Sequence, residues 1–225
     1  MSKNQRTGNR KQRKIGIKST VPDLGYYFIV TDTEETEQNY MYGLRNSIPD
    51  EYRRRLIITV CKTKTANLVT EATQLAALQP QYGEPWIIFD RDQVENFDKI
   101  IDDANNAGIK AGWSNPCIEI WFGAYFGKMP SYNDSVSCCK GFSSAFEKQT
   151  NQKYQKSDKQ IYAKLCKYGS ETAAIKLAKD KLSQCIFSGA EKPSDMTPCT
   201  TVYKLVNEIK TKIQKGNKVK PAKNP

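Results

Sequence analysis

Carboxylates are the residues of this sequence whose spacing best suggests chemistry. Asp90 and Asp92 follow the apolar run WIIF, and Asp32 follows the apolar run YYFIVT. Since alternate residues of a strand share a face, we expect both side chains of the Asp-x-Asp pair to point the same way. Two converging carboxylates repel each other unless a divalent cation lies between them. A third carboxylate, from Asp32, Glu34 or Glu37, would complete an all-oxygen metal site suited to phosphoryl chemistry.

These acids also have a structural interpretation. Aspartate is favoured at helix N-caps and in turns, so Asp90 could simply cap a helix. The acidic run 34–37 could complement the positive end of a helix. The Asp90 and Asp92 pair favours the functional interpretation, whereas Asp32 alone favours neither.

Histidine is absent from the 225 residues. Its absence excludes Ser-His-Asp and Cys-His catalysis, histidine-based ribonuclease sites and most catalytic zinc sites. Hydrolytic chemistry would then rely on carboxylates, lysine, tyrosine or a hard metal ion with oxygen ligands. Mg²⁺ (or Mn²⁺) is the natural candidate, because Mg²⁺ binds through one or two carboxylates together with substrate phosphates.

Cysteine usage and hydropathy bear on the cellular compartment. The seven cysteines include no C-x-x-C pair, so neither a disulfide framework nor a zinc site is predicted. We expect ordinary buried thiols, with a redox role for Cys138 and Cys139 as the minor alternative. No apolar run is long enough to span a bilayer, and the basic N-terminus lacks the apolar segment of a signal peptide. The expected location is cytoplasmic, without membrane association.

The elements that must position the acids are visible in the hydrophobic pattern. Short β-branched and aromatic runs predict buried strands, and amphipathic segments between them predict helices. This alternation implies right-handed crossovers and a parallel sheet with helices on both faces. Ligands of such sheets collect at the carboxyl ends of the strands. The predicted strands are 26–31, 56–60, 86–89 and 109–113, and the predicted helices run from the acidic segment toward Arg45, over 67–79 and over 94–107.

The second half of the chain has a helical pattern, over 117–126, 137–149, 158–168, 170–187 and 198–215. The predicted fold class is therefore α/β, with a parallel sheet of about four strands flanked by helices and a helical C-terminal extension. The predicted organisation is a disordered basic arm (1–22), an α/β body (23–130), a helical extension packed on it (131–209) and a basic tail (210–225).

Positive charge is concentrated at the two ends. The formal net charge is +11, from 35 basic and 24 acidic residues. Residues 1–19 contain seven basic residues and residues 209–225 contain six, without any acid, which leaves 22 basic residues against all 24 acids between them. Cationic arms attract polyanions by counterion release and raise encounter rates. The alternative is that these ends only improve solubility.

Four sequence blocks, in this order, resemble the RloB-like proteins, a divergent branch of the Toprim fold. The family's Glu-Gly-x-x-Thr-Glu-x-x-Tyr motif is similar to DTEETEQNY at 32–40, and its W-x-x-F-D-R-D motif is similar to WIIFDRD at 86–92. The S-N-P-x-x-E-x-W motif is similar to SNPCIEIW at 114–121, and a family-like ending, PCTTVYKLVNEI, occupies 198–209. The resemblance covers residues 26–210.

The resemblance implies a Toprim-like sheet with a metal-binding carboxylate after the first strand and an Asp-x-Asp after the third. By position, Asp90 and Asp92 would be metal ligands, and Glu37 a second-metal ligand or water-orienting carboxylate. Glu119 would be a further acidic group, or else a helix cap or the partner of a buried base. The implied activity is cleavage of DNA or of structured RNA such as tRNA, in antiphage (abortive-infection) defence and often beside a partner ATPase.

The chain departs from the first motif, because Asp32 and Thr33 stand where the family has Glu and Gly. Aspartate is one methylene shorter, and Thr33 lacks the conformational freedom of glycine in a tight turn. Two hypotheses remain. One is a Mg²⁺-dependent nuclease with Asp32 or Glu37 completing the site, and the other is a catalytically weakened Toprim-like subunit that binds nucleic acid or a defence ATPase. A primase- or topoisomerase-like module ranks below both, because nothing in this sequence resembles the primase accessory region or the tyrosine-bearing domain that such modules need.

Overall fold

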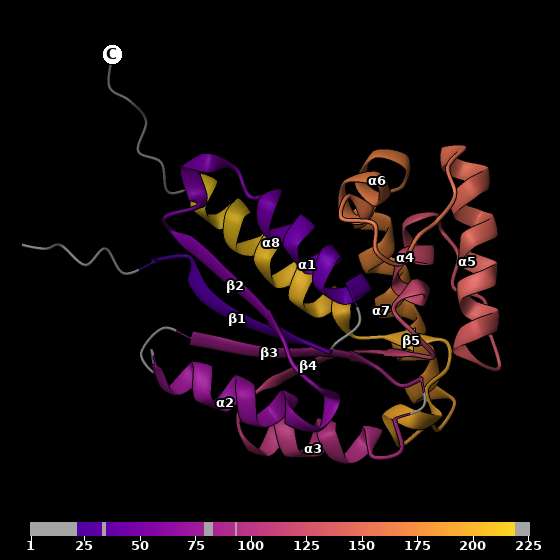
Figure 1. Ribbon diagram of the computed structural model, residues 1–225, viewed down its shortest axis with the longest axis horizontal. Coiled ribbons are helices and arrows are strands. Elements are labelled where there is room, and N and C mark those ends of the chain that lie inside the picture. Colours follow the sequence, from indigo (N-terminus) through magenta and orange to yellow (C-terminus); the bar gives the residue numbers. More distant parts are fainter. Residues whose placement is uncertain (1–21, 33–34, 79–82, 93, 219–225) are drawn as a thin grey trace, which may run out of the picture.

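A five-stranded sheet forms the centre of the protein, seen in a computed structural model that describes residues 22–32, 35–78, 83–92 and 94–218 (Figure 1). The strand order is β2-β1-β3-β4-β5, with the first four strands parallel and β5 antiparallel to β4. The strands are β1 (Gly25–Thr31), β2 (Leu56–Lys62), β3 (Gly83–Asp90), β4 (Lys110–Asn115) and β5 (Cys199–Thr200).

The α/β fold class and the four predicted strands are confirmed, with strand ends displaced by a few residues. The short fifth strand lies where we expected the last helix to begin. Two residues are too few to show an alternating hydrophobic pattern, so β5 has no recognisable signal in the sequence.

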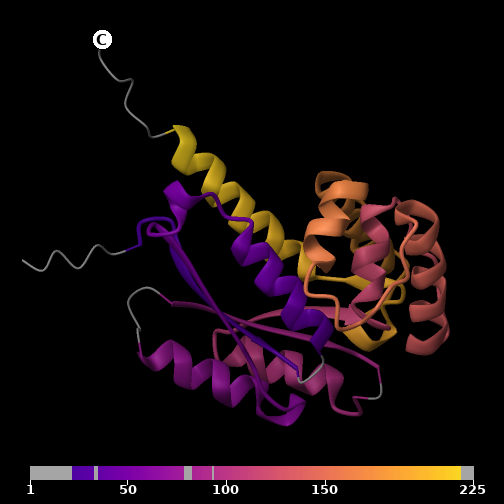
Figure 2. The same cartoon turned by 45° about the horizontal axis from the view of Figure 1, so that its top comes forward.

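Helices cover both faces of the sheet, as Figures 1 and 2 show. The helices α1 and α8 lie on one face and α2 and α3 on the other, while α4 to α7 form a cluster beyond the carboxyl ends of β1 and β3. Three short 3₁₀ turns, η1 (Asp50–Tyr52), η2 (Thr65–Asn67) and η3 (Pro193–Asp195), lie in the connections. The helices are α1 (Glu35–Asn46), α2 (Leu68–Leu78), α3 (Phe97–Asn106), α4 (Glu119–Tyr125), α5 (Ser135–Thr150), α6 (Ile161–Tyr168), α7 (Glu171–Phe187) and α8 (Val202–Lys218).

The predicted basic arm lies almost wholly outside the described residues, and the predicted basic tail lies partly outside them. Of the basic arm, only residue 22 is described. The predicted basic tail begins inside a helix, because α8 continues to Lys218. Residues 210–218 therefore belong to an ordered element that packs on the sheet through its first turns.

Alternating residues of the central strands supply two hydrophobic cores. Ile29 and Ile88 belong to the core beneath α1 and α8, whereas Val30 and Ile87 belong to the core beneath α2 and α3. All four side chains are at most 1% exposed. Because a strand buried on both faces needs apolar residues at every position, these runs lack polar alternation.

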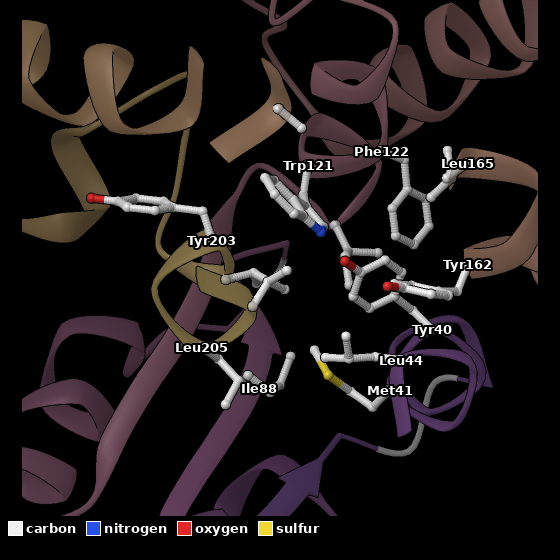
Figure 3. Close-up of a cluster of buried hydrophobic side chains, with 14 of the residues drawn as sticks. Tyr40, Met41, Leu44, Ile88, Trp121, Phe122, Tyr162, Leu165, Tyr203 and Leu205 are labelled. Carbon is white, nitrogen blue, oxygen red and sulfur yellow. The ribbon is translucent and has the colours of Figure 1, made fainter. Parts of the chain in front are cut away.

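Aromatic residues join α1 to the helical cluster, as Figure 3 shows. The ring of Tyr40 lies 5.3 Å from the rings of Phe122 and Tyr162, measured between centroids. The Tyr40 hydroxyl also forms a 2.8 Å hydrogen bond with the hydroxyl of Tyr125. These contacts fix the first turn of α1, which carries Glu37, against α4, which carries Glu119.

Candidate active site

A cavity of ≈ 260 Å³ lies where β1 and β3 end, and all five predicted site residues line it. Asp90 is the last residue of β3, and Asp32 directly follows β1. The first turn of α1 provides Glu37, and α4 begins with Glu119. The structure thus brings together acids that are up to 87 positions apart in the sequence (32 to 119). Their roles as metal ligands stay predictions.

Asp90 is the most constrained of these acids. Its Oδ2 accepts a 2.9 Å hydrogen bond from the amide of Ile118, while its Oδ1 is buried without a hydrogen-bond partner among the described residues. Burial, and then the nearby carboxylates of Glu37 and Glu119, raise the pKa of Asp90 well above its usual value. Glu37 and Glu119 are each only 2% exposed. Three acids crowded in this way favour a proton or a cation between them.

Asp92 lines the cavity because of a turn after β3, and not because of the strand alternation that we expected. Strand β3 ends at Asp90, so the alternation of side chains along a strand does not apply to Asp92. Its backbone instead adopts a φ of 26°, which is rare for residues other than glycine and is best tolerated by Asp and Asn. The amide of Asp92 donates to the carbonyl of Pro116 at 3.0 Å, and the hydroxyl of Ser135 donates to Asp92 Oδ1. The chain beyond β3 is thereby held in this turn.

Asp32 lines the same cavity, and its carboxylate is held from the neighbouring strand connection. The hydroxyl of Thr65, in η2 after β2, donates a hydrogen bond to Asp32 Oδ2. The amide of Asp32 donates to the carbonyl of Ile88 at 3.2 Å. Thr33 and Glu34 lie outside the described residues, so the predicted effect of replacing glycine at position 33 remains a prediction.

Glu119 is oriented by a tyrosine. The hydroxyl of Tyr154 donates to Glu119 Oε1 at 2.8 Å. Burial, followed by the charge of Glu119, raises the pKa of Tyr154, so this tyrosine stays a hydrogen-bond donor at neutral pH. The position of Glu119 on the cavity wall agrees with an acidic group of the site.

Six of the residues that line the cavity were not among the predicted site residues, and three of them bear on its chemistry. Lys156, in the connection between α5 and α6, places a cation among the acids, and Ser135 and Cys117 complete the wall. Each belongs to a segment distant in sequence from the Asp-x-Asp pair. Ser135 and Lys156 reach the cavity through the docking of α5 and its following loop, whereas Cys117 lies in the connection between β4 and α4, and no local pattern indicates that the three meet.

A second group with metal-binding potential adjoins this cavity, where Cys117 and Glu119 line the wall and Cys139 lines the neighbouring cavity. One ligand atom from each of Cys117, Glu119 and Cys139 lies within 4.8 Å of the others, and the two Sγ atoms are 4.0 Å apart. Within the described parts of the chain, this is the group that meets such a criterion, and Asp32, Asp90 and Asp92 are outside it. The cysteine pattern gave no indication of this group. The expectation of buried thiols is confirmed for Cys117, Cys138 and Cys199 but is wrong for the other four, because Cys166 is exposed and Cys61, Cys139 and Cys185 are half-buried.

The donors of the cavity suit more than one kind of ion. Carboxylate oxygens are ligands for Mg²⁺ or Mn²⁺, and the buried Asp90 Oδ1 without a hydrogen-bond partner is an atom that such a cation would satisfy. Thiolates, in contrast, favour softer ions such as Zn²⁺. The acids at the ends of β1 and β3 therefore fit the predicted hard cation, whereas the two sulfur atoms, together with Glu119, suit a softer ion.

Comparison with known proteins places the chain in a family. Residues 27–209 match the family model described as RloB-like protein. No significant match was found among curated proteins or among solved structures. In the ranges that the structure describes, every helix is too short or too polar to cross a membrane. Since the family match spans most of the sequence and includes each block that carries the acids, the chain belongs to the RloB-like protein family.

Proposed function

We propose that the protein is a metal-dependent nuclease that hydrolyses phosphodiester bonds of DNA or RNA, structured RNA such as tRNA included. The observation that supports this proposal best is the convergence of five carboxylates in one cavity at the carboxyl ends of β1 and β3. A recess lined by acids repels an anionic substrate unless cations are bound there. In a phosphodiesterase that uses Mg²⁺ or Mn²⁺, the bound cation would offset the charge of the acids and attract the phosphate.

Asp90 and Asp92 would hold the cation, with Asp32 or Glu37 completing the set. A bound Mg²⁺ ion lowers the pKa of a water ligand and neutralises charge that develops on the phosphate. Glu37, in the first turn of α1, is suited to orient the attacking water. Lys156 lies at the same cavity and can pair with a phosphate oxygen. The hydroxyl of Tyr154 keeps Glu119 in a fixed orientation.

A role in antiphage defence, together with a partner ATPase, is proposed from membership of the RloB-like family. Residues 1–19, which hold seven of the 35 basic residues and no acid, are suited to attract nucleic acid over a long range, whereas Lys210 and Lys212 of the other basic end are paired with Glu171 and Glu84. The same features agree with a second hypothesis, in which the shorter Asp32 weakens catalysis and the protein acts by binding.

A cleavage assay separates these two functions. Plasmid DNA and total RNA are incubated with the protein with and without Mg²⁺ or Mn²⁺, and wild type is compared with Asp90→Ala and Asp92→Ala. We expect cleavage that requires the metal and falls at least a hundredfold in both variants, since removal of one group that stabilises the transition state typically costs that much.

A matched control is Asp102→Ala, an exposed aspartate of α3 that does not line the cavity. This variant should cleave like wild type. Equal cleavage by all variants would reveal a contaminating nuclease. Cleavage by wild type that does not require the metal would refute the metal-dependent mechanism, and no cleavage by any version would favour the binding role.

A further inference from the structure

The candidate active site continues into a groove along α5. A second cavity shares Asp92, Ser135 and Lys156 with the carboxylate cavity and extends over the first half of α5. A third cavity, between α5 and α4 with its following loop, shares Ser144 with the second. The second and third cavities meet at Ser144, and we call the two together the α5 groove.

Lysine side chains follow the α5 groove. Lys140 and Lys148 line it at either side of Ser144, at intervals of four residues. Residues spaced by four lie on one face of a helix, and eight residues span about 12 Å along its axis. Lys156 lies at the end near the carboxylates and Lys128 at the far end, and all four lysines are exposed.

Few acids oppose these cations. Of the carboxylates near the groove, Glu119 and Asp92 belong to the candidate active site. Asp134 is engaged as the N-cap of α5, where it accepts a 2.6 Å hydrogen bond from the amide of Ser137. Glu147 is an exposed residue of the same helix but does not line the cavities. The groove therefore presents mostly positive charge.

Apolar contact surface accompanies this charge. Val136 is 61% exposed and lies at the groove entrance, beside Ser135. Tyr132 is half-buried and lines both the far cavity and a cavity that it shares with Val136 and Asp92. Proteins that bind single strands combine a basic groove for the backbone with aromatic and apolar side chains for the bases.

We propose that the α5 groove binds the backbone of single-stranded nucleic acid and leads it to the carboxylate cavity. This inference rests on the proposed function, because it names the substrate form for the same site. The reason for a single strand is the depth of the site: Asp90 Oδ1 is buried, and Glu37 and Glu119 are 2% exposed. A flexible strand or loop can lower a phosphate into such a recess, whereas both backbones of a rigid duplex must move together.

Binding is tested on the full chain without catalysis. The probe is a fluorescent 20-nucleotide single strand, and the comparison is a duplex of the same sequence, both measured by fluorescence anisotropy in EDTA over a series of salt concentrations. The double variant Lys140→Ala and Lys148→Ala should bind the single strand more weakly. Its plot of log Kd against log salt should also be flatter by about 1.4, which is about 0.7 for each lost phosphate contact.

The matched control is Lys176→Ala and Lys179→Ala, which removes two exposed lysines of one helix, α7, outside the groove. Equal loss in the two double variants, or a duplex that binds as tightly as the single strand, overturns the proposal. Because EDTA prevents hydrolysis, groove-dependent binding without metal-dependent cleavage would refute only the proposed nuclease. Metal-dependent cleavage of the single strand that is equally fast in wild type and in the Lys140→Ala and Lys148→Ala variant would refute only the proposed role of the groove.

Discussion

At the scale of single residues, Asp90 combines features that oppose folding. In the ionised form of Asp90, the buried Oδ1 lacks a hydrogen-bond donor in the described chain, and the charges of Glu37 and Glu119 disfavour this form. A buried polar atom without a partner costs about 1–3 kcal/mol. Retaining such an arrangement makes physical sense if the acid gains a ligand in the functional state.

A thermal-shift experiment tests this interpretation. A ligand at about 100 times its Kd stabilises the folded state by about 2.7 kcal/mol, which corresponds to about 5–10 °C in Tm for a chain of this size. We expect saturating Mg²⁺ or Mn²⁺ to raise Tm by that order in wild type and by much less in Asp90→Asn. In EDTA, Asp90→Asn should be at least as stable as wild type, because it removes a crowded carboxylate. An Asp90→Asn protein with the full metal-induced shift would show that Asp90 is not a ligand.

The Cys117, Glu119 and Cys139 group makes the choice of metal informative. Zn²⁺ could bind there, since the sulfur atoms are 4.0 Å apart. Stabilisation by Zn²⁺ that survives in Asp90→Asn would therefore belong to the thiols. Stabilisation by Mg²⁺ belongs to the carboxylates, because thiolates are poor ligands for hard ions.

At the scale of elements, the aromatic contacts of α1 position Glu37. Leu44 lies two turns after Glu37 on α1, is 1% exposed and belongs to the same core as Trp121 and Leu165 (Figure 3). Truncation of Leu44 to alanine removes buried methyl groups and leaves a cavity, at a cost of about 2–5 kcal/mol. We expect Leu44→Ala to lower the free energy of unfolding by that amount in denaturant titrations.

The matched control is Leu78→Ala, at the end of α2. Leu78 is 74% exposed, so the same change of residue should alter stability by no more than about 0.5 kcal/mol. An equal loss of unfolding free energy in the two variants would show that the core beneath α1 does not stabilise the position of this helix.

The strands were predictable because their signal is local. Val30 and Ile87 belong to runs that are apolar at every position, as burial on both faces requires. Asp32 and Asp90 could be assigned to one edge because parallel strands end on the same side. Asp92 was correctly predicted to lie at that edge, but for the wrong reason. Its side chain is oriented by a turn with positive φ and not by the alternation of residues along a strand.

The rest of the site could not be predicted, because it depends on contacts between distant elements. Ser135 and Lys156 join the cavity through contacts between distant elements, because the hydroxyl of Ser135 donates to Asp92 and the hydroxyl of Thr36 in α1 donates to the carbonyl of Lys156. The sulfur atoms of Cys117 and Cys139 meet across 22 positions without a recognisable spacing. Sequence patterns identify the elements, but they do not specify which faces of two helices come together.

At the scale of the whole molecule, the C-terminal helix closes the fold at the end of the sheet opposite the candidate active site. Glu84, at the start of β3, is paired with Lys110 of β4 at 3.1 Å and with Lys212 of α8. Lys110 also contacts Glu208 of α8 at 2.9 Å, and the hydroxyl of Tyr27 in β1 donates to Glu208 at 2.8 Å. One charged cluster thus ties α8 to three central strands.

This cluster predicts a pH dependence of stability. Burial favours the neutral form of Glu84, but hydrogen bonds with Glu208, Lys212 and Lys110 outweigh burial and lower the pKa of Glu84 to about 2. A carboxylate with a lowered pKa stabilises the folded state above its ordinary pKa of 4.5, and this stabilisation is lost as the pH falls through about 2. For Glu208, burial and the hydrogen bond with Glu84 raise the pKa, so Glu208 opposes part of the effect.

We therefore expect wild type to exceed Glu84→Gln in Tm at pH 6 and this difference to shrink as the pH falls from about 4.5 toward 2. Thermal unfolding followed by circular dichroism at several pH values measures the difference in Tm and its change with pH. Asp50→Asn is a suitable control, because Asp50 forms an ion pair with Arg53 at 2.8 Å with both side chains more than half exposed, and such pairs contribute little. A difference between wild type and Glu84→Gln that stays constant over the whole range would mean that Glu84 is not ionised through this cluster. Metal binding should be unaffected by Glu84→Gln, since Glu84 lies at the opposite end of β3 from Asp90.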